Sequence, residues 1–170
     1  MQLGDAAAAY LTAPTAASIH ALRTAITAEP TYTAGAEHVA EASALVAAQR
    51  FDEAVACLSY WRRGAFFSPS THRLLTEALR ATGQAELADY EEQLSWHAIA
   101  SLLESGDGSR IRPYLVLRVS DEYDVLEVLE KSSTRQAVEM EGGRVLDVFE
   151  CEDGSEVWFE LFRGGRGGGQ

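Results

Sequence analysis

The hydrophobic period of the chain changes at Gly108. Before that glycine, apolar residues return every three or four positions, as at Ile19, Leu22 and Ile26, which is the period of an amphipathic helix. In residues 144–162, apolar residues instead alternate with polar or charged ones, which is the period of a strand with one buried face. Because one period follows the other along the chain, we predict an α+β protein in which a helical region precedes a sheet.

The helical region is predicted to cover residues 1–105. Short polar residues that cap helices alternate there with the helix-ending residues proline and glycine. The predicted caps are Asp5, Thr15, Asp52 and either Ser68 or Ser70, and the predicted stops are Pro14, Pro30, Gly64 and Gly83. These signals predict helices at about 6–13, 15–29, 37–50, 52–63, 68–82 and 85–104.

A second module is predicted for residues 106–163, with the order β-α-β-β-β. A strand at 113–119 leads to a short helix capped by Ser120, and three more strands form an antiparallel meander. Trp158 is expected to face either the helical region or solvent. Residues 164–170 are rich in glycine and are predicted to form a flexible tail. The predicted later strands are 134–141, 144–152 and 156–162, with turns at Gly142-Gly143 and Asp153-Gly154.

The charge of the chain restricts its partners. The 170 residues carry a formal net charge of −12, which disfavours nucleic acid and anionic membrane surfaces. No apolar run reaches the roughly 18 residues of a membrane span, and the N-terminus lacks the basic region of a secretory signal. Cys57 and Cys151 lie in apolar periodic segments and are expected to be buried thiols. Together these features favour a cytoplasmic protein.

The helical region repeats weakly with a period of 34 residues. His38 matches His72, and Leu45 matches Leu79. This offset resembles that of tetratricopeptide (TPR) repeats, although the first helix of each pair lacks the large aromatic residue near its start. Because two pairs are too few for a free-standing solenoid, we expect a short antiparallel array packed against the second module.

One helix face of this array is a candidate partner-binding surface. Arg73, Glu77 and Arg80 are separated by four and three residues, so they share a face. Two interpretations stay open: the arginines bind carboxylates of a partner, or Glu77 pairs with both and all three are solvated. Trp61, in an aromatic group around Gly64, is a further candidate for the interface.

Two segments resemble a bacterial family known as a domain of unknown function. They are SGDGSRIRPYLVLRVSDEYDVLEVL, from Ser105, and VLDVFECEDGSEVWFELF, from Val145. The family joins TPR-like helices to a C-terminal module that opens with a Gly-Asp-Gly turn and ends in an acidic hairpin. The resemblance covers about residues 19–162 and departs at Ser109, where the family usually has lysine. It implies this architecture and no catalytic activity.

The chain carries no recognisable catalytic or cofactor motif. The Gly106-Asp107-Gly108 turn follows a helix, precedes a strand and has no lysine after it, whereas a phosphate loop has the reverse order. The histidines lack metal-ligand spacing, and we expect no cofactor or metal. An enzyme would need a cleft between helices and sheet lined by Asp107, Glu122, Tyr123 and Asp124.

Three hypotheses about function follow. The first is a cytoplasmic bacterial adaptor, not an enzyme, that binds a protein partner through the helical groove or the acidic sheet. The second is a small acidic inhibitor or immunity protein that masks a basic site. The third is an enzyme with its site between the helices and the sheet.

Overall fold

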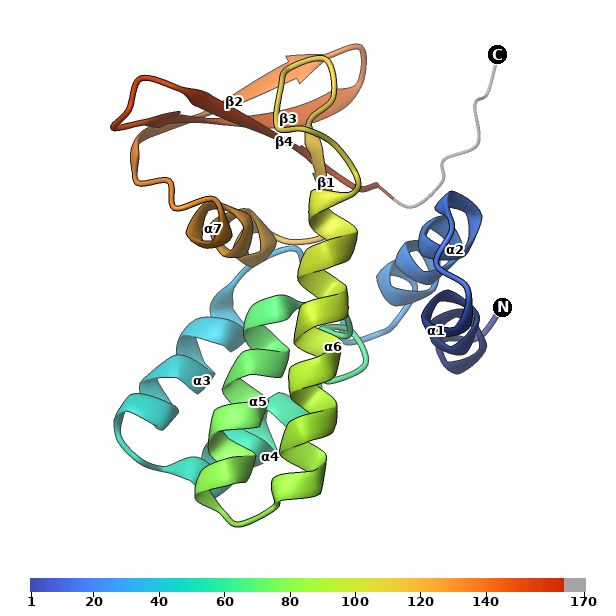
Figure 1. Ribbon diagram of the computed structural model, residues 1–170, viewed down its shortest axis with the longest axis vertical. Coiled ribbons are helices and arrows are strands. Elements are labelled where there is room, and N and C mark those ends of the chain that lie inside the picture. The colour runs from blue at the N-terminus through green and yellow to red at the C-terminus, as the bar shows by residue number, and fades with distance from the viewer. Residues whose placement is uncertain (164–170) are drawn as a thin grey trace.

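The computed structural model describes residues 1–163, which form seven helices and one four-stranded sheet (Figure 1). The α+β class predicted from the period change is confirmed. The predicted flexible tail, 164–170, lies outside the described residues. The helices are α1 (Leu3–Thr12), α2 (Ala16–Thr27), α3 (Glu37–Ala47), α4 (Phe51–Trp61), α5 (Pro69–Ala81), α6 (Ala85–Leu103) and α7 (Val119–Val128). The strands are β1 (Tyr114–Val116), β2 (Ser133–Glu141), β3 (Arg144–Cys151) and β4 (Glu156–Leu161).

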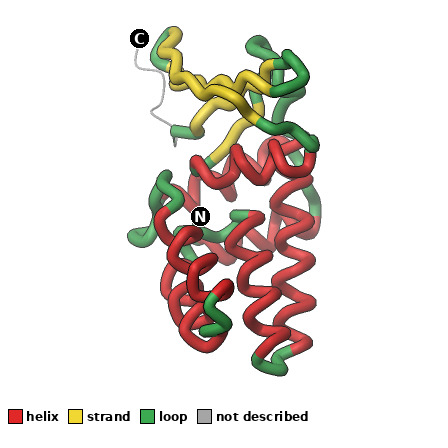
Figure 2. Tube along the Cα trace, turned by 90° about the vertical axis from the view of Figure 1, so that its left-hand side faces the viewer, coloured by secondary structure: helices red, strands yellow, loops and turns green. Residues whose placement is uncertain are grey.

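The sheet has the strand order β1-β4-β3-β2. Strands β2, β3 and β4 form the predicted antiparallel meander, and β1 pairs in parallel with β4. Figure 2 shows the sheet at one end of the molecule and the long helices at the other, with α7 between them. The order β1-α7-β2-β3-β4 therefore confirms the predicted β-α-β-β-β module.

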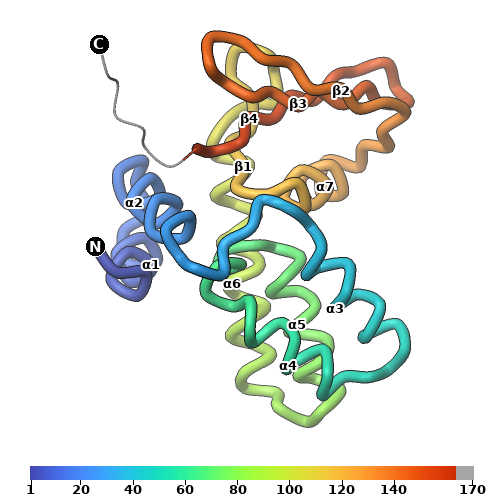
Figure 3. The backbone as a smooth tube through the Cα atoms, turned by 180° about the vertical axis from the view of Figure 1, so that it is seen from behind, coloured from blue at the N-terminus to red at the C-terminus, as the bar shows by residue number. Residues whose placement is uncertain are grey.

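Helices α3 to α6 form two antiparallel pairs beneath α7, and α1 and α2 pack together at their side (Figure 3). The second helices of the two pairs begin at Phe51 and Ala85, which are 34 positions apart as the repeat predicts. Ala42, Ala54 and Ala88 are fully buried where these helices meet. Their small side chains let the helix backbones approach closely. Ala54 and Ala88 are 34 positions apart, so these two contact points follow the weak repeat, whereas the position 34 after Ala42 is Thr76.

The core joins the two predicted modules. One cluster of buried residues combines Leu22 and Ile26 of α2 with Leu117 and Phe162 of the module. A second cluster packs the end of α6 against α7 and the inner face of the sheet, through residues such as Leu102 and Phe159. The boundary near residue 105 therefore separates two kinds of secondary structure that share one core. None of the helices in the described part of the chain is long and apolar enough to cross a bilayer.

The turn at 105–109 is a close backbone crossing. A Cβ at Gly106 would lie 2.3 Å from the carbonyl oxygen of Pro113, and Gly108 has a φ of +74°. Asp107 folds the loop by accepting a hydrogen bond from the amide of Ser109 at 3.0 Å. These contacts give the loop a structural role between α6 and β1.

Two local predictions for the module are wrong. The first strand ends at Val116, and α7 begins before Ser120, because Asp121 in its first turn accepts the backbone N–H of Arg118 at 3.1 Å. Trp158 faces neither the helices nor solvent. It lies buried on the outer sheet face, with the guanidinium of Arg110 at 5.0 Å from its ring. The loop before β1 thus covers that face.

Both cysteines are free thiols, but Cys57 is only partly buried, whereas Cys151 is buried as predicted.

Candidate partner-binding groove

Helices α5, α6 and α7 enclose a groove of about 330 Å³. Its wall combines apolar side chains with three carboxylates and one guanidinium. The lining residues are Pro69, Arg73, Thr76, Glu92, Ser95, Trp96, Ile99, Asp124, Glu127 and Val128. The groove lies where the helical array meets the module, so it exists only once both have folded.

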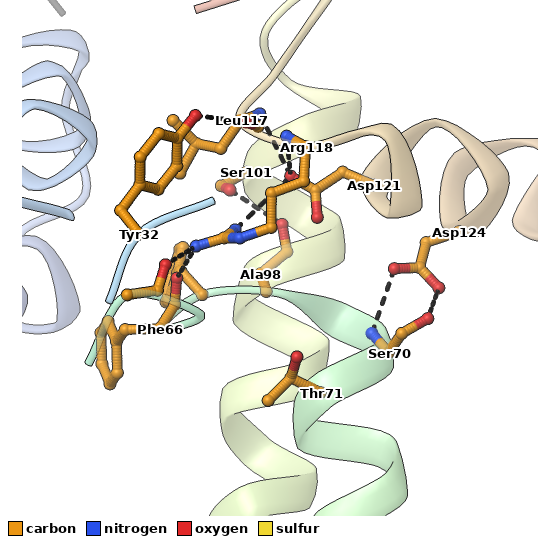
Figure 4. Close-up of polar contacts among 12 residues, drawn as sticks. Tyr32, Phe66, Ser70, Thr71, Ala98, Ser101, Leu117, Arg118, Asp121 and Asp124 are labelled. Carbon is orange, nitrogen blue, oxygen red and sulfur yellow. Dashed lines mark hydrogen bonds and ion pairs between the residues drawn. The ribbon is translucent and has the colours of Figure 1, made fainter. Parts of the chain in front are cut away.

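Asp124 of α7 fixes the position of the groove walls. Its carboxylate accepts the backbone N–H of Ser70 at 3.0 Å and also the hydroxyl of Ser70, as Figure 4 shows. These bonds satisfy a free N–H in the first turn of α5 and set a negative charge at the positive end of that helix. Burial raises the pKa of Asp124, and the bonds from Ser70 oppose that rise. The contact ties α7 to α5 across one end of the groove.

The candidate arginines are both paired within the molecule. Arg73 lies 3.3 Å from a carboxylate oxygen of Glu127 and 3.8 Å from one of Asp124. Arg80 lies 2.8 Å from Glu92 and 3.3 Å from Asp89. The arginines are thus engaged by carboxylates of α6 and α7, which weakens the hypothesis that they bind carboxylates of a partner.

Glu77 shares the exposed face with these arginines, as predicted, but the ion pairs of Arg73 and Arg80 in the described structure do not include it. The interpretation that Glu77 pairs with both arginines is therefore wrong, although all three side chains are exposed, as it expected. Trp61 lies away from the groove, on α4, where it is partly buried and packs against the ring of His38 with 5.7 Å between centroids. Of the four candidate residues, the groove contains only Arg73.

The residue that sequence reasoning missed is Trp96. It lines the groove and yet 67% of its surface is exposed. Its position gives a signal in retrospect, because it follows Leu94 of the buried stripe by two residues, and two helix positions turn the side chain about 200° away. A large aromatic residue off the apolar stripe of a helix is a candidate interface residue.

The residues of the enzyme hypothesis do not meet in one cleft. Asp107 lies in the exposed loop before β1, and Tyr123 points from α7 to strand β2, where its hydroxyl lies 3.3 Å from Gln136. Glu122 is buried against the sheet, and only Asp124 lines the groove. The four side chains therefore cannot act on one substrate in this arrangement.

A buried network of charged residues holds α7, one wall of the groove, in position (Figure 4). Arg118, just before α7, is fully buried and donates hydrogen bonds to the carbonyl oxygens of Gly64 and Phe66. Asp121 lies beside it and accepts the N–H groups of Leu117 and Arg118 at 3.1 Å each. Burial raises the pKa of Asp121 to about 6, and the charge of Arg118 opposes that rise. The network anchors α7 to the loop between α4 and α5.

A histidine holds the same loop from the other side. His72 of α5 lies fully buried, with Nδ1 at 2.6 Å from a carboxylate oxygen of Glu91 and Nε2 accepting the N–H of Phe67 at 3.1 Å. Because Nε2 accepts that bond, the ring proton lies on Nδ1 and the imidazole is neutral. Phe67 needs this support, since its φ of +62° is unfavourable for a bulky residue.

Within residues 1–163, no group of three or more histidine, cysteine or acidic side chains is arranged to hold a metal ion. The lining of the groove combines apolar surface, the exposed indole of Trp96 and three carboxylates against one guanidinium. None of the protein-family models, curated proteins or solved structures compared with the chain matches it.

Proposed function

We propose that the protein is a cytoplasmic bacterial adaptor that binds a protein partner through the groove between α5, α6 and α7. The observation that carries this proposal is Trp96, an exposed indole in a groove whose charged lining is three carboxylates and one arginine. Exposed tryptophans are enriched among residues that dominate binding energy, because one side chain buries a large rigid surface. The resemblance of the helices to TPR repeats supports the same reading.

The groove chemistry favours a basic partner. Glu92 and Glu127 lie on its wall, and the indole of Trp96 offers a face to a cation. A lysine or arginine of the partner, followed by an apolar side chain, would place its charge near the carboxylates and its apolar part against Ile99 and Val128. The carboxylates of the sheet are paired with arginines, as those of the groove are, with Glu139 at 3.0 Å from Arg110 and Glu150 at 2.6 Å from Arg135. The sheet is the weaker candidate because its tryptophan, Trp158, is buried, whereas Trp96 of the groove is exposed.

The proposal is tested with the partner that the protein captures from its bacterial host. Trp96→Ala should weaken binding of that partner, once purified, at least about tenfold, because it removes the central apolar contact. Tyr60→Ala is the matched control, since Tyr60 is an equally exposed aromatic residue outside the groove and should change the affinity less than about twofold. Calorimetry measures both values. Equal binding by wild type and Trp96→Ala would remove the groove from the proposal.

Salt dependence separates a basic partner from an apolar one. If partner cations meet Glu92 and Glu127, the affinity should fall as sodium chloride rises, because exposed charge pairs are screened. Glu127→Gln should reduce that slope. A partner whose affinity does not change with salt contradicts the basic character proposed for it. Recovery of one stoichiometric basic enzyme or toxin, inactive when bound, would favour the inhibitor hypothesis over the adaptor.

A further inference from the structure

Strand β2 leaves a long edge of the sheet open. It is the last strand in the order β1-β4-β3-β2 and has nine residues, nearly all of them exposed. Val138 and Met140 are 63% and 68% exposed. Natural edge strands are protected by charged side chains (lysine above all), by proline, bulges or shortness, or by a covering segment. The sequence of β2, STRQAVEME, contains neither proline nor lysine, and its single irregularity lies at one end, between Ser133 and Arg135. Its charged residues, Arg135, Glu139 and Glu141, are of both signs, so they do not by themselves repel a second copy of the strand.

The backbone of β2 directs alternate N–H and C=O groups toward the open edge, where another strand could pair with them. Gly142 and Gly143 have φ values of +57° and +83° and form a two-residue hairpin turn between Glu141 and Arg144. In such a hairpin the closing pair bonds inward, and the direction alternates along the strand. The N–H and C=O groups of alternate residues therefore point to the open edge: Met140, Val138 and Gln136.

The charges along β2 fit a second copy of the same strand. In an antiparallel pair with its twofold axis at Val138, Arg135 of each copy lies opposite Glu141 of the other. With the axis at Ala137, Arg135 lies opposite Glu139 instead. Both registers bring opposite charges together, whereas an in-register parallel pair would set Glu139 against Glu139. Within one chain these side chains also form exposed ion pairs, Arg135 with Glu150 and both glutamates with Arg110, and such pairs are weak enough to be shared with a second copy. The strand is thus complementary to itself in the antiparallel direction.

The apolar residues of β2 would also lie next to each other in such an antiparallel pair of β2 strands. Val138 and Met140 lie on the sheet face that carries α7, since they alternate with Ala137, which packs on the opposite face. On the same side, the exposed ring of Tyr123 reaches from α7 to Gln136. An antiparallel second copy would add its own Val138, Met140 and Tyr123 to this strip and remove the exposed apolar surface from water.

We propose that β2 is a dimerisation edge, at which two copies of the chain join antiparallel into one continuous eight-stranded sheet. The contact is isologous, so the dimer closes and leaves only the three-residue strands β1 at the two outer edges. This inference is independent of the groove, which lies on the far side of α7 from β2.

Sedimentation equilibrium of the full chain tests the proposal. The wild-type protein should be mostly dimeric at about 0.5 mM, where a micromolar Kd gives nearly complete association. Val138→Lys sets two like charges near the twofold axis and should make the protein monomeric. Ile111→Lys adds the same charge at another exposed site and should leave the dimer intact. A wild-type monomer at all concentrations, or a dimer that survives Val138→Lys, overturns the proposal.

Charge-reversal variants of β2 test whether the two chains join through this strand. Arg135→Glu alone, and the double variant Glu139→Arg with Glu141→Arg, should each be largely monomeric, because like charges then face each other in both registers. Mixing the two variants restores opposite charges on both sides of the axis and should give a heterodimer. Circular dichroism confirms that each variant is folded. Folded variants that do not associate when mixed, or that dimerise as well alone as the wild type does, contradict the antiparallel β2 contact.

Discussion

Glu122 shows how a single buried side chain ties stability to pH. It is fully buried between α7 and the sheet, and neither of its carboxylate oxygens accepts a hydrogen bond from the described residues. Burial raises the pKa of Glu122 from its ordinary 4.5 to about 9, and the neighbouring carboxylate of Asp147 on β3 adds to the rise through its negative charge and by favouring the protonated form as a hydrogen-bond partner. The folded protein therefore holds this proton at neutral pH, where the unfolded chain releases it.

The consequence is a loss of stability as pH rises. Between pH 4.5 and about 9 the folded state binds more protons than the unfolded state, so the free energy of unfolding falls through that window. Glu122→Gln keeps the shape without the charge and should stabilise the protein by about 2–4 kcal/mol at pH 8.5. Urea unfolding at pH 5 and pH 8.5 measures this difference. The exposed Glu152→Gln is the control, and an equal pH dependence in both variants would show that Glu122 is ionised in the fold.

At the scale of elements, the two kinds of helix cap differ in how far the sequence reveals them. Thr15 caps α2 through the amide of Ser18 at 3.1 Å, as its position predicts. Helix α5 begins after Ser68, whose side chain makes no capping bond. The carboxylate of Asp124, 54 residues after Ser70, caps the helix instead by accepting the backbone N–H of Ser70. A cap next to its helix in the chain can be predicted from sequence, whereas a cap supplied by another element cannot.

Substitution of Asp124 tests its role as the cap of α5. Asp124→Ala should destabilise the protein by about 1–3 kcal/mol, because it leaves a buried N–H of Ser70 unpaired, and should speed hydrogen exchange at the start of α5. Exchange read by mass spectrometry locates the effect. Asp89→Ala removes an exposed carboxylate that pairs with Arg80 and should change stability by less than about 0.5 kcal/mol. Equal effects of the two changes would argue against a capping role for Asp124.

For the whole molecule, the shared core predicts cooperative unfolding. Leu117 and Phe162 of the module pack on α1 and α2, and Arg118 reaches into the loop between α4 and α5. Far-ultraviolet circular dichroism follows the helices and the near-ultraviolet signal includes Trp158, so both should report one thermal midpoint. Residues 1–105 expressed alone should bind a hydrophobic dye and lose that cooperative transition. Two separate midpoints in the full chain would show that the modules fold independently.

The predictions from sequence differ in how far the structure tests them. The α+β order follows from residues that act locally, such as the alternation in 144–151 and the glycine pairs at turns. The resemblance to a bacterial domain of unknown function stays a prediction, as does the adaptor role. Binding of a partner by Arg73 and Arg80 also stays a prediction. The sequence could not show that carboxylates of α6 and α7 pair with these arginines, because those carboxylates come close only in the folded chain.

The sequence by itself determined the kinds and order of the elements, because hydrophobic period, caps and turn residues act over a few positions. Only the tertiary structure decided which polar residues are buried, as with Arg118 and Glu122, and which apolar ones are exposed, as with Trp96 and Val138. The same is true of the groove and of the open edge of β2. Both arise where elements distant in the chain meet or fail to meet, and no local pattern records that.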